Sequence, residues 1–362
     1  MAIAPARRTA FAVLDRVETG GWASDLLLAA SAALEARDAG LASEIVFGVL
    51  RYRAQLDFLI EHFGAQGKLD REVRTALRMG IYQLRYLERV PAHAAVAESV
   101  ELVKHARKRS AAGMVNAVLR KVDRAPVEWP TREVELSCPE WLLARWERHH
   151  GTERARAIAL AALEEPEKYV RVSAAGARFQ DIGSQSIVPL LDLAPGQTFL
   201  DLCAAPGNKT AQALEAGVRA VACDLHLHRL RPMRGMGADL VVLDGTRPLA
   251  LRRRFDRILV DAPCSGTGTL GRNPEIKWRL RPDDLADLHG RQTALLRNAL
   301  AALAPGGRLV YSTCSLEPEE NRQVVEEAGD GREITVWERL PGRDAGDGFW
   351  AAVIKSIESA NG

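Results

Sequence analysis

The chain has 362 residues, enough for two domains, and its 47% hydrophobic and 27% charged residues are typical of a soluble globular protein. No apolar run reaches the length of a membrane span and the first residues lack a secretion signal, so we expect a cytoplasmic protein that contacts no membrane. Five cysteines without paired short spacing argue against a disulfide framework and a zinc site. We therefore expect reduced thiols and no metal.

The charge is distributed unevenly. Residues 1–125 carry 19 Lys and Arg against 14 Asp and Glu, whereas the remainder carries 30 against 33. A basic front half indicates an anionic partner, although a solvated arginine-rich surface would give the same count.

Residues 5–125 place apolar side chains at helical spacing throughout, which predicts an all-α bundle. Pro91 interrupts the pattern before a further helix from about residue 94. Basic residues gather at 104–109 and 120–124, at the ends of the last two predicted helices. Such residues can simply cap helices, but two neighbouring clusters slightly favour a phosphate-binding face.

Prolines after residue 125 mark a linker, which leads to a predicted helix from Trp141 to about Leu163 and a lone strand over 169–172. Residues 173–178 are interpreted only as a connection. From residue 180 strands and helices alternate, which predicts a doubly wound parallel α/β sheet. A helix from residue 283 is expected to end at Pro305-Gly306-Gly307.

Acidic residues follow several of the predicted strands. Asp224 lies 23 positions after Asp201, near the offset at which an acid binds ribose hydroxyls, and Asp244 and Asp261 follow later strands. One such acid alone is typical of a helix cap, but the set lines one edge of the sheet. The turn after the first strand has a single glycine, Gly207, and lacks the dinucleotide fingerprint, so the pattern favours S-adenosylmethionine over NAD.

Two cysteines also follow strands. Cys264 comes three residues after Asp261, and Cys314 follows the strand at 309–311. Adding a thiolate to carbon 6 of cytosine or uracil makes carbon 5 nucleophilic, and the reaction needs a partner for ring nitrogen 3 and a base for elimination. These two thiols and Asp261 supply such groups, but the chemistry alone does not assign the two cysteines. We expect Cys138 and Cys223 to be packed thiols.

Three motifs carry a resemblance to a known family. They are Asp201-Leu-Cys-Ala-Ala-Pro-Gly-Asn-Lys-Thr210, Asp261-Ala-Pro-Cys-Ser-Gly-Thr-Gly268 with Asn273-Pro-Glu-Ile-Lys-Trp278, and Tyr311-Ser-Thr-Cys-Ser-Leu-Glu-Pro-Glu-Glu-Asn321. In this order they resemble the motif set of the Sun-type RNA (cytosine-5) methyltransferases. The helical front half is similar to the NusB-like RNA-binding domain of the RsmB branch, which methylates a cytosine in 16S ribosomal RNA. That similarity rests on Gly48-Val-Leu-Arg51, Tyr82-Gln-Leu-Arg85, Pro91-Ala-His93 and Asn116-Ala-Val-Leu-Arg120.

The resemblance implies a role for each motif. Cys314 would be the nucleophile at carbon 6 and Cys264 would help to eliminate the enzyme, whereas DNA cytosine methyltransferases use the cysteine of a Pro-Cys turn. S-adenosylmethionine would be held by the following residues: Cys203, Ala204, Ala205, Pro206, Gly207, Asn208, Lys209, Asp224, Asp244 and Asp261. Cys203 would contribute backbone rather than its thiol.

Two departures from the family pattern stand out. Asn208 replaces a usual second glycine, and because asparagine tolerates positive φ better than most residues, we expect cofactor binding to be retained. The segment between Val172 and Gln180 is shorter than in relatives, and Ser173 replaces a usual asparagine. This shortening of the accessory RNA-binding subdomain bears on the RNA contact surface and target site more than on the chemistry.

We therefore expect an S-adenosylmethionine-dependent RNA (cytosine-5) methyltransferase that acts as a monomer on 16S ribosomal RNA. Its modules would be a NusB-like all-helical domain (1–125), a linker with an abridged accessory subdomain (126–178) and a Rossmann-like methyltransferase domain (179–362). The alternatives are a non-catalytic RNA-binding ribosome-assembly factor, and the same chemistry on tRNA.

Overall fold

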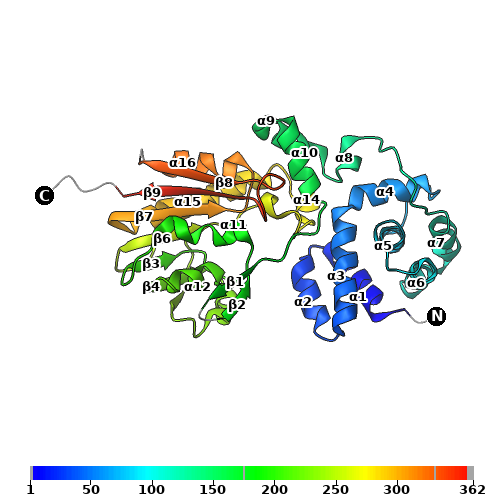
Figure 1. Cartoon of the computed structure of the whole chain (residues 1–362), viewed down its shortest axis with the longest axis horizontal. Coiled ribbons are helices and arrows are strands. Elements are labelled where there is room, and N and C mark those ends of the chain that lie inside the picture. The colour runs from blue at the N-terminus through cyan, green and yellow to red at the C-terminus, as the bar shows by residue number, and fades with distance from the viewer. Residues whose placement is uncertain (1–2, 174–175, 330–331, 357–362) are drawn as a thin grey trace. The chain divides into compact units, whose positions relative to one another are not determined.

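A computed structural model of the chain describes residues 3–173, 176–329 and 332–356 (Figure 1). By compactness the chain forms two units. Unit 1 comprises Met1–Glu165 and Leu270–Arg279, and unit 2 comprises Pro166–Thr269 and Leu280–Gly362. The functional modules expected from the sequence remain a proposal.

Unit 1 is helical, as the periodicity predicts. The expected helix over 141–163 is two helices, because Gly151 adopts φ +83° between them. The helices are α1 (Pro5–Val17), α2 (Ala23–Ser31), α3 (Ala36–Arg51), α4 (Arg53–His62), α5 (Arg71–Tyr86), α6 (Ala92–His105), α7 (Ala112–Leu119), α8 (Arg132–Glu135), α9 (Glu140–His150), α10 (Thr152–Ala161) and α14 (Ile276–Arg279). None of the helices in the described part of the chain is long and apolar enough to cross a membrane.

Buried polar contacts tie the bundle together. The guanidinium of Arg7 donates to Gln83 at 2.6 Å and to Glu98 at 2.8 Å, which joins α1 to α5 and α6. Gly48 lets α3 approach α5 closely, because a Cβ there would lie 1.9 Å from the ring of Tyr82. Residues of the motifs at 48–51 and 82–85 therefore have a packing role in unit 1.

The 270–279 segment, which follows the Cys264 turn in sequence, packs within unit 1 against the ends of α1 and α3. The indole N–H of Trp278 donates to the carbonyl of Leu50 at 2.7 Å, and Lys277 donates to the carbonyl of Arg51 at 2.9 Å. Lys277 is fully buried, and burial lowers the pKa of its amine to about 8. The segment thus satisfies carbonyls that a helix end leaves without intrahelical partners.

Unit 2 contains a seven-stranded sheet in its described residues, with strand order β5-β4-β3-β6-β7-β9-β8. Strands β5, β4, β3, β6 and β7 pair in parallel, as predicted, whereas β9 pairs antiparallel with β7 and β8. The strands are β3 (Thr198–Asp201), β4 (Arg219–Asp224), β5 (Asp239–Val242), β6 (Phe255–Asp261), β7 (Leu303–Thr313), β8 (Ile334–Arg339) and β9 (Phe349–Lys355).

Helices cover the two faces of the sheet (Figure 1). Alternating side chains of the strands pack against these helices. Leu200, Ile258 and Leu309 pack with apolar residues of α15 (Asp284–Ala301) and α16 (Arg322–Ala328). Phe199, Leu259 and Val310 pack with the opposite layer. That layer includes α12 (Asn208–Leu214), and α11 (Ile182–Gln185) and α13 (Leu227–Leu230) complete the helices of unit 2. Because both faces are covered, functional groups are left at the strand ends.

Two local predictions are corrected. The predicted lone strand is β1 (Val170–Ser173), which pairs antiparallel with β2 (Gly176–Phe179), a strand that the sequence did not indicate. Pro305-Gly306-Gly307 lies at the start of β7 rather than at the end of the helix, which ends at Ala301. The alanine-rich sequence before Pro305 gives no local signal for this earlier end.

The role of the 270–279 segment predicts a stability change. Trp278→Phe keeps the ring but leaves the carbonyl of Leu50 without its donor, so we expect a loss of about 1 kcal/mol in the free energy of unfolding. Urea titration of the full chain measures it. Trp337→Phe, which alters an indole on β8 of unit 2, is the matched control, and equal losses in both variants would contradict the role.

Candidate active site

The carboxyl ends of the parallel strands bring the predicted polar groups to one edge of the sheet. Asp201, Asp224 and Asp261 are the last residues of β3, β4 and β6, and Cys314 directly follows β7. Asp261 lies beside Ser312 in the pairing of β6 with β7. The predicted gathering of strand-end residues is therefore present, at the edge where α/β folds bind ligands.

The two thiols lie side by side. The sulfur atoms of Cys264 and Cys314 are 3.4 Å apart, within hydrogen-bonding distance for sulfur. The amide of Gly268 donates to the carbonyl of Cys314 at 2.8 Å, which holds the two turns together. A Cβ at residue 268 would lie 2.4 Å from the carbonyl oxygen of Gly348, so glycine is required there.

The environment of the thiols differs between the two positions. The hydrogen bond to Cys314, with burial as a second cause, raises the pKa of the Cys264 thiol well above its ordinary value. Cys264 therefore keeps its proton and can share it with the sulfur of Cys314.

Asp261 is fixed by two donors. Lys209 donates to Oδ2 at 2.7 Å and Ser312 donates to Oδ1 at 2.8 Å. The ammonium group of Lys209 also lies 5.2 Å from the centre of the Phe349 ring. The carboxylate and the ammonium group thus form an oriented pair at the end of β6, three residues before Cys264 in sequence.

The turn at 203–209 links β3 to α12. Gly207 adopts φ +102° and precedes Asn208, the first residue of α12. The tolerance of asparagine for positive φ is therefore not needed at residue 208, because Gly207 takes the left-handed backbone. A Cβ at Gly207 would lie 2.8 Å from the side chain of Met233.

The other three cysteines differ from Cys264 and Cys314. Cys138 and Cys223 are fully buried, as packed thiols are. Burial raises the pKa of Cys203 well above its ordinary value, so its thiol stays protonated.

Asp224 and Asp244 are held by the turns that follow them. The backbone amide of His226 donates to Asp224 at 3.0 Å. Thr246 donates to Asp244 from both its hydroxyl, at 2.6 Å, and its amide, at 3.0 Å, and these bonds lower the pKa of Asp244. Leu225, next to Asp224, is more than half exposed, which leaves an apolar side chain at this edge of the sheet.

Residues that the sequence argument did not single out complete the site. Glu320 is fully buried and accepts hydrogen bonds from Ser265, Ser315 and Gln292. Glu320 was within a quoted motif, but glutamates near a strand end are common at protein surfaces, and only the fold shows it buried under both cysteine turns.

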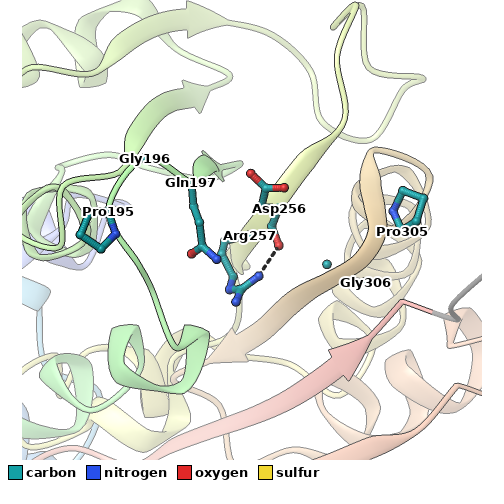
Figure 2. Close-up of a pocket in the computed structure, with 8 residues that line it drawn as sticks. Pro195, Gly196, Gln197, Asp256, Arg257, Pro305 and Gly306 are labelled. Atoms are coloured by element: carbon teal, nitrogen blue, oxygen red, sulfur yellow. Dashed lines mark hydrogen bonds between the residues drawn. The ribbon is translucent and has the colours of Figure 1, made fainter.

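A cavity of about 550 Å³ lies elsewhere (Figure 2). Its lining includes Gln197 before β3, Asp256 and Arg257 at the start of β6, and Gly306 at the start of β7. These residues lie at the amino ends of strands whose carboxyl ends hold the cysteines. Figure 2 shows the guanidinium of Arg257 reaching the backbone of Asp256, a bond of 3.0 Å that uses the side chain structurally.

Asp201 gives this site a pH-dependent stability. Burial raises the pKa of its carboxyl from 3.8 to about 7, against an opposing hydrogen bond from Thr210. Between these values the folded chain keeps a proton that the unfolded chain releases, so this group lowers stability as pH rises from about 4 to 7.

Asp201→Asn removes that loss. As the pH rises, the free energy of unfolding of the variant should increase relative to that of wild type. The difference gained should be on the order of 4 kcal/mol above pH 7. Denaturant titrations at pH 5 and pH 8 measure the difference. A gain of equal size at both pH values would contradict the raised pKa of Asp201.

Comparison with known proteins places these features in a family. The model of the 16S rRNA methyltransferase RsmB/F family matches residues 188–336, and that of the NusB family matches residues 4–124. Ribosomal RNA small subunit methyltransferase B of Erwinia tasmaniensis is 33% identical, over 93% of this chain and 95% of the relative. The probable enzyme of that name from Bacillus subtilis is 31% identical, over 88% of this chain and 87% of the relative.

Solved structures share the fold. PH0851 superposes with a TM-score of 0.78 at 20% identity, covering 98% of this chain and all of that one. A methyltransferase homolog from Pyrococcus horikoshii covers 62% of this chain and 97% of its own, with a TM-score of 0.53 and 25% identity. The fold and family expected from the motifs are thereby confirmed. The chain belongs to the RsmB/F family of S-adenosylmethionine-dependent RNA (cytosine-5) methyltransferases.

Proposed function

We propose that this enzyme methylates carbon 5 of a cytosine in 16S ribosomal RNA through a covalent bond between Cys314 and the base. The observation that carries the chemistry is the 3.4 Å contact between Cys264 and Cys314. The names of relatives that match nearly the whole chain support 16S ribosomal RNA as the substrate.

Cys314 begins the reaction by adding its thiolate to carbon 6 of the cytosine, which makes carbon 5 nucleophilic. Asp261 accepts hydrogen bonds from Lys209 and Ser312, so its remaining lone pairs can accept from the amino group of the base. Lys209 brings a donor and a positive charge to the ring as electron density moves towards nitrogen 3. The target base must leave its stack to reach these groups.

Cys264 acts after the methyl group has been transferred. The proton on carbon 5 must leave and the bond between carbon 6 and the sulfur of Cys314 must break, which restores the aromatic ring. The protonated thiol of Cys264, 3.4 Å from that sulfur, can give its proton to the leaving thiolate, and the Cys264 thiolate formed in this way can accept the proton from carbon 5. This division of roles is consistent with the raised pKa of Cys264.

S-adenosylmethionine supplies the electrophilic methyl group when bound. The turn at 203–209 suits such a ligand. Gly207 takes the left-handed backbone that leads into α12, and the buried Oδ1 of Asp201, at the end of β3, has no hydrogen-bond partner among the described residues. Asp224 would bind the ribose hydroxyls and Asp244 the adenine amino group, with the exposed side chain of Leu225 against the ring. The cofactor-binding role of these residues follows the resemblance and the strand-end positions.

Unit 1 offers a surface for the RNA backbone. Arg107, Arg109, Arg120 and Lys121 are exposed near the ends of α6 and α7. Arg124, from the same sequence cluster, instead donates to the carbonyls of Leu84 and Leu87 and is a structural cap. Arg107, Arg109, Arg120 and Lys121 support a phosphate-binding face, whereas Arg124, although also exposed, is used by carbonyls at the end of α5.

The two cysteine roles predict different products. Cys264→Ala should accumulate a covalent protein–RNA adduct when incubated with cofactor and unmodified 16S RNA, because addition proceeds and elimination is slowed. Cys314→Ala should form neither adduct nor 5-methylcytosine. A denaturing gel with labelled RNA separates these products from wild type.

An adduct in Cys314→Ala would show that the roles are reversed. If wild type methylates tRNA and leaves 16S RNA unmodified, the proposed substrate is wrong but the proposed chemistry is unaffected. The short segment after Val172 would then be the first place to look for an altered RNA contact.

The cofactor turn yields a separate prediction. Gly207→Ala places a Cβ 2.8 Å from Met233 and strains a left-handed backbone, so we expect at least a tenfold weaker affinity for S-adenosylmethionine, about 1.4 kcal/mol. Isothermal titration measures it. Gly237→Ala, at another left-handed glycine with open space, is the control, and equal losses would remove the special role of residue 207.

A further inference from the structure

One buried carboxylate fastens the two cysteine turns to each other. Oε1 of Glu320 accepts from the amide of Ser265 at 2.7 Å and from the side chain of Gln292 at 3.0 Å. Oε2 accepts from the hydroxyl of Ser265 at 2.5 Å and from the hydroxyl of Ser315. Both oxygens therefore have two donors.

The donors are the immediate neighbours of the reactive thiols. Ser265 follows Cys264 and Ser315 follows Cys314, and their hydroxyls are 3.1 Å apart. Gln292 extends the attachment, since its amide also donates to the carbonyl of Pro263 at 2.9 Å. A displacement of Glu320 would thus move both turns.

Glu320 is itself held rigidly. The hydroxyl of Tyr311, from the buried part of β7, donates to the backbone carbonyl of Glu320 at 2.6 Å. Asn321, the next residue, donates to the carbonyl of Ser315 at 2.8 Å and accepts from Thr313 at 2.5 Å. The carboxylate is therefore anchored to the same strand that carries Cys314.

We propose that Glu320 is a positioning residue that sets the distance between the sulfur atoms of Cys264 and Cys314. This inference rests on the proposed roles of the two cysteines. Glu320 does not serve as the base for carbon 5, because its two oxygens are already occupied by Ser265, Ser315 and Gln292. It acts on the reaction through the turns that it holds.

Two substitutions separate geometry from charge. In Glu320→Gln the amide oxygen can keep the bonds from the Ser265 amide and from Gln292. Its NH₂ can donate to the two serine hydroxyls, which accept as readily as they donate. This variant keeps the attachments without the charge, whereas Glu320→Ala removes both. Glu326→Ala, at an exposed glutamate on α16, is the matched control.

We expect Glu320→Ala to lower kcat for RNA methylation by about 10²-fold, the effect of misplacing a reacting group by about 1 Å, while KM for RNA and affinity for S-adenosylmethionine stay close to wild type. Glu320→Gln should recover most of this loss. Wild-type turnover in Glu320→Ala, or equal losses in both variants, would overturn the proposal.

Should Glu320→Ala fail to fold, the double variant Ser265→Ala with Ser315→Ala decides. It removes both hydroxyl attachments and leaves the carboxylate in place. A loss of kcat with retained cofactor affinity supports the positioning role, and wild-type turnover contradicts it.

The distance between the thiols can also be probed without RNA. Phenylarsine oxide condenses with two adjacent thiols, forming two arsenic–sulfur bonds and releasing water. Wild type and Glu320→Gln should each bind one equivalent of phenylarsine oxide at the Cys264–Cys314 pair. Cys264→Ser should lack this binding, and Glu320→Ala should bind the probe more weakly than wild type does. Unchanged binding in Glu320→Ala would overturn the proposal. Because the probe needs no substrate, this result stands apart from whether 16S RNA is methylated.

Discussion

The parallel pairing of β6 with β7 is the constraint on which the active site depends. It sets Asp261 beside Ser312, so the turns that follow the two strands begin at the same edge of the sheet. The amide of Gly268 and the carboxylate of Glu320 then join these turns, and the two sulfur atoms come to 3.4 Å. Two thiols that lie 50 positions apart in sequence are thereby brought within hydrogen-bonding distance of each other. No cluster of potential metal ligands is found among the described residues.

Much of this arrangement follows from the sequence. Apolar runs that end in acids or cysteines identify parallel strands, and the rule that such strands share one functional edge is enough to gather Asp224, Asp261 and Cys314. The resemblance of three motifs then orders the two cysteines, which chemical reasoning from residue types left open. The family comparison agrees with this identification, whereas the assigned roles of the site residues await experiment.

Other features depend on tertiary contacts that leave little local trace. Strand β9 lies antiparallel between β7 and β8, and its sequence Phe349–Lys355 has no feature that sets its direction. The sequence suggests a positive φ at Asn208. In the structure α12 begins at Asn208, and the preceding residue, Gly207, has the positive φ instead. Glutamate is usually a surface residue. Glu320 can be buried because four hydrogen bonds, from Ser265, Ser315 and Gln292, converge on its carboxylate.

The central claim is that Cys314 forms the bond to the base. RNA containing 5-fluorocytidine at the target position tests it, because fluorine at carbon 5 prevents the final proton loss and traps the methylated adduct. After nuclease and trypsin digestion, mass spectrometry should place the nucleotide on the peptide spanning residues 309–322. Attachment to the peptide spanning residues 258–272, which carries Cys264, would contradict the assignment, and a methylated product without any adduct would contradict covalent catalysis.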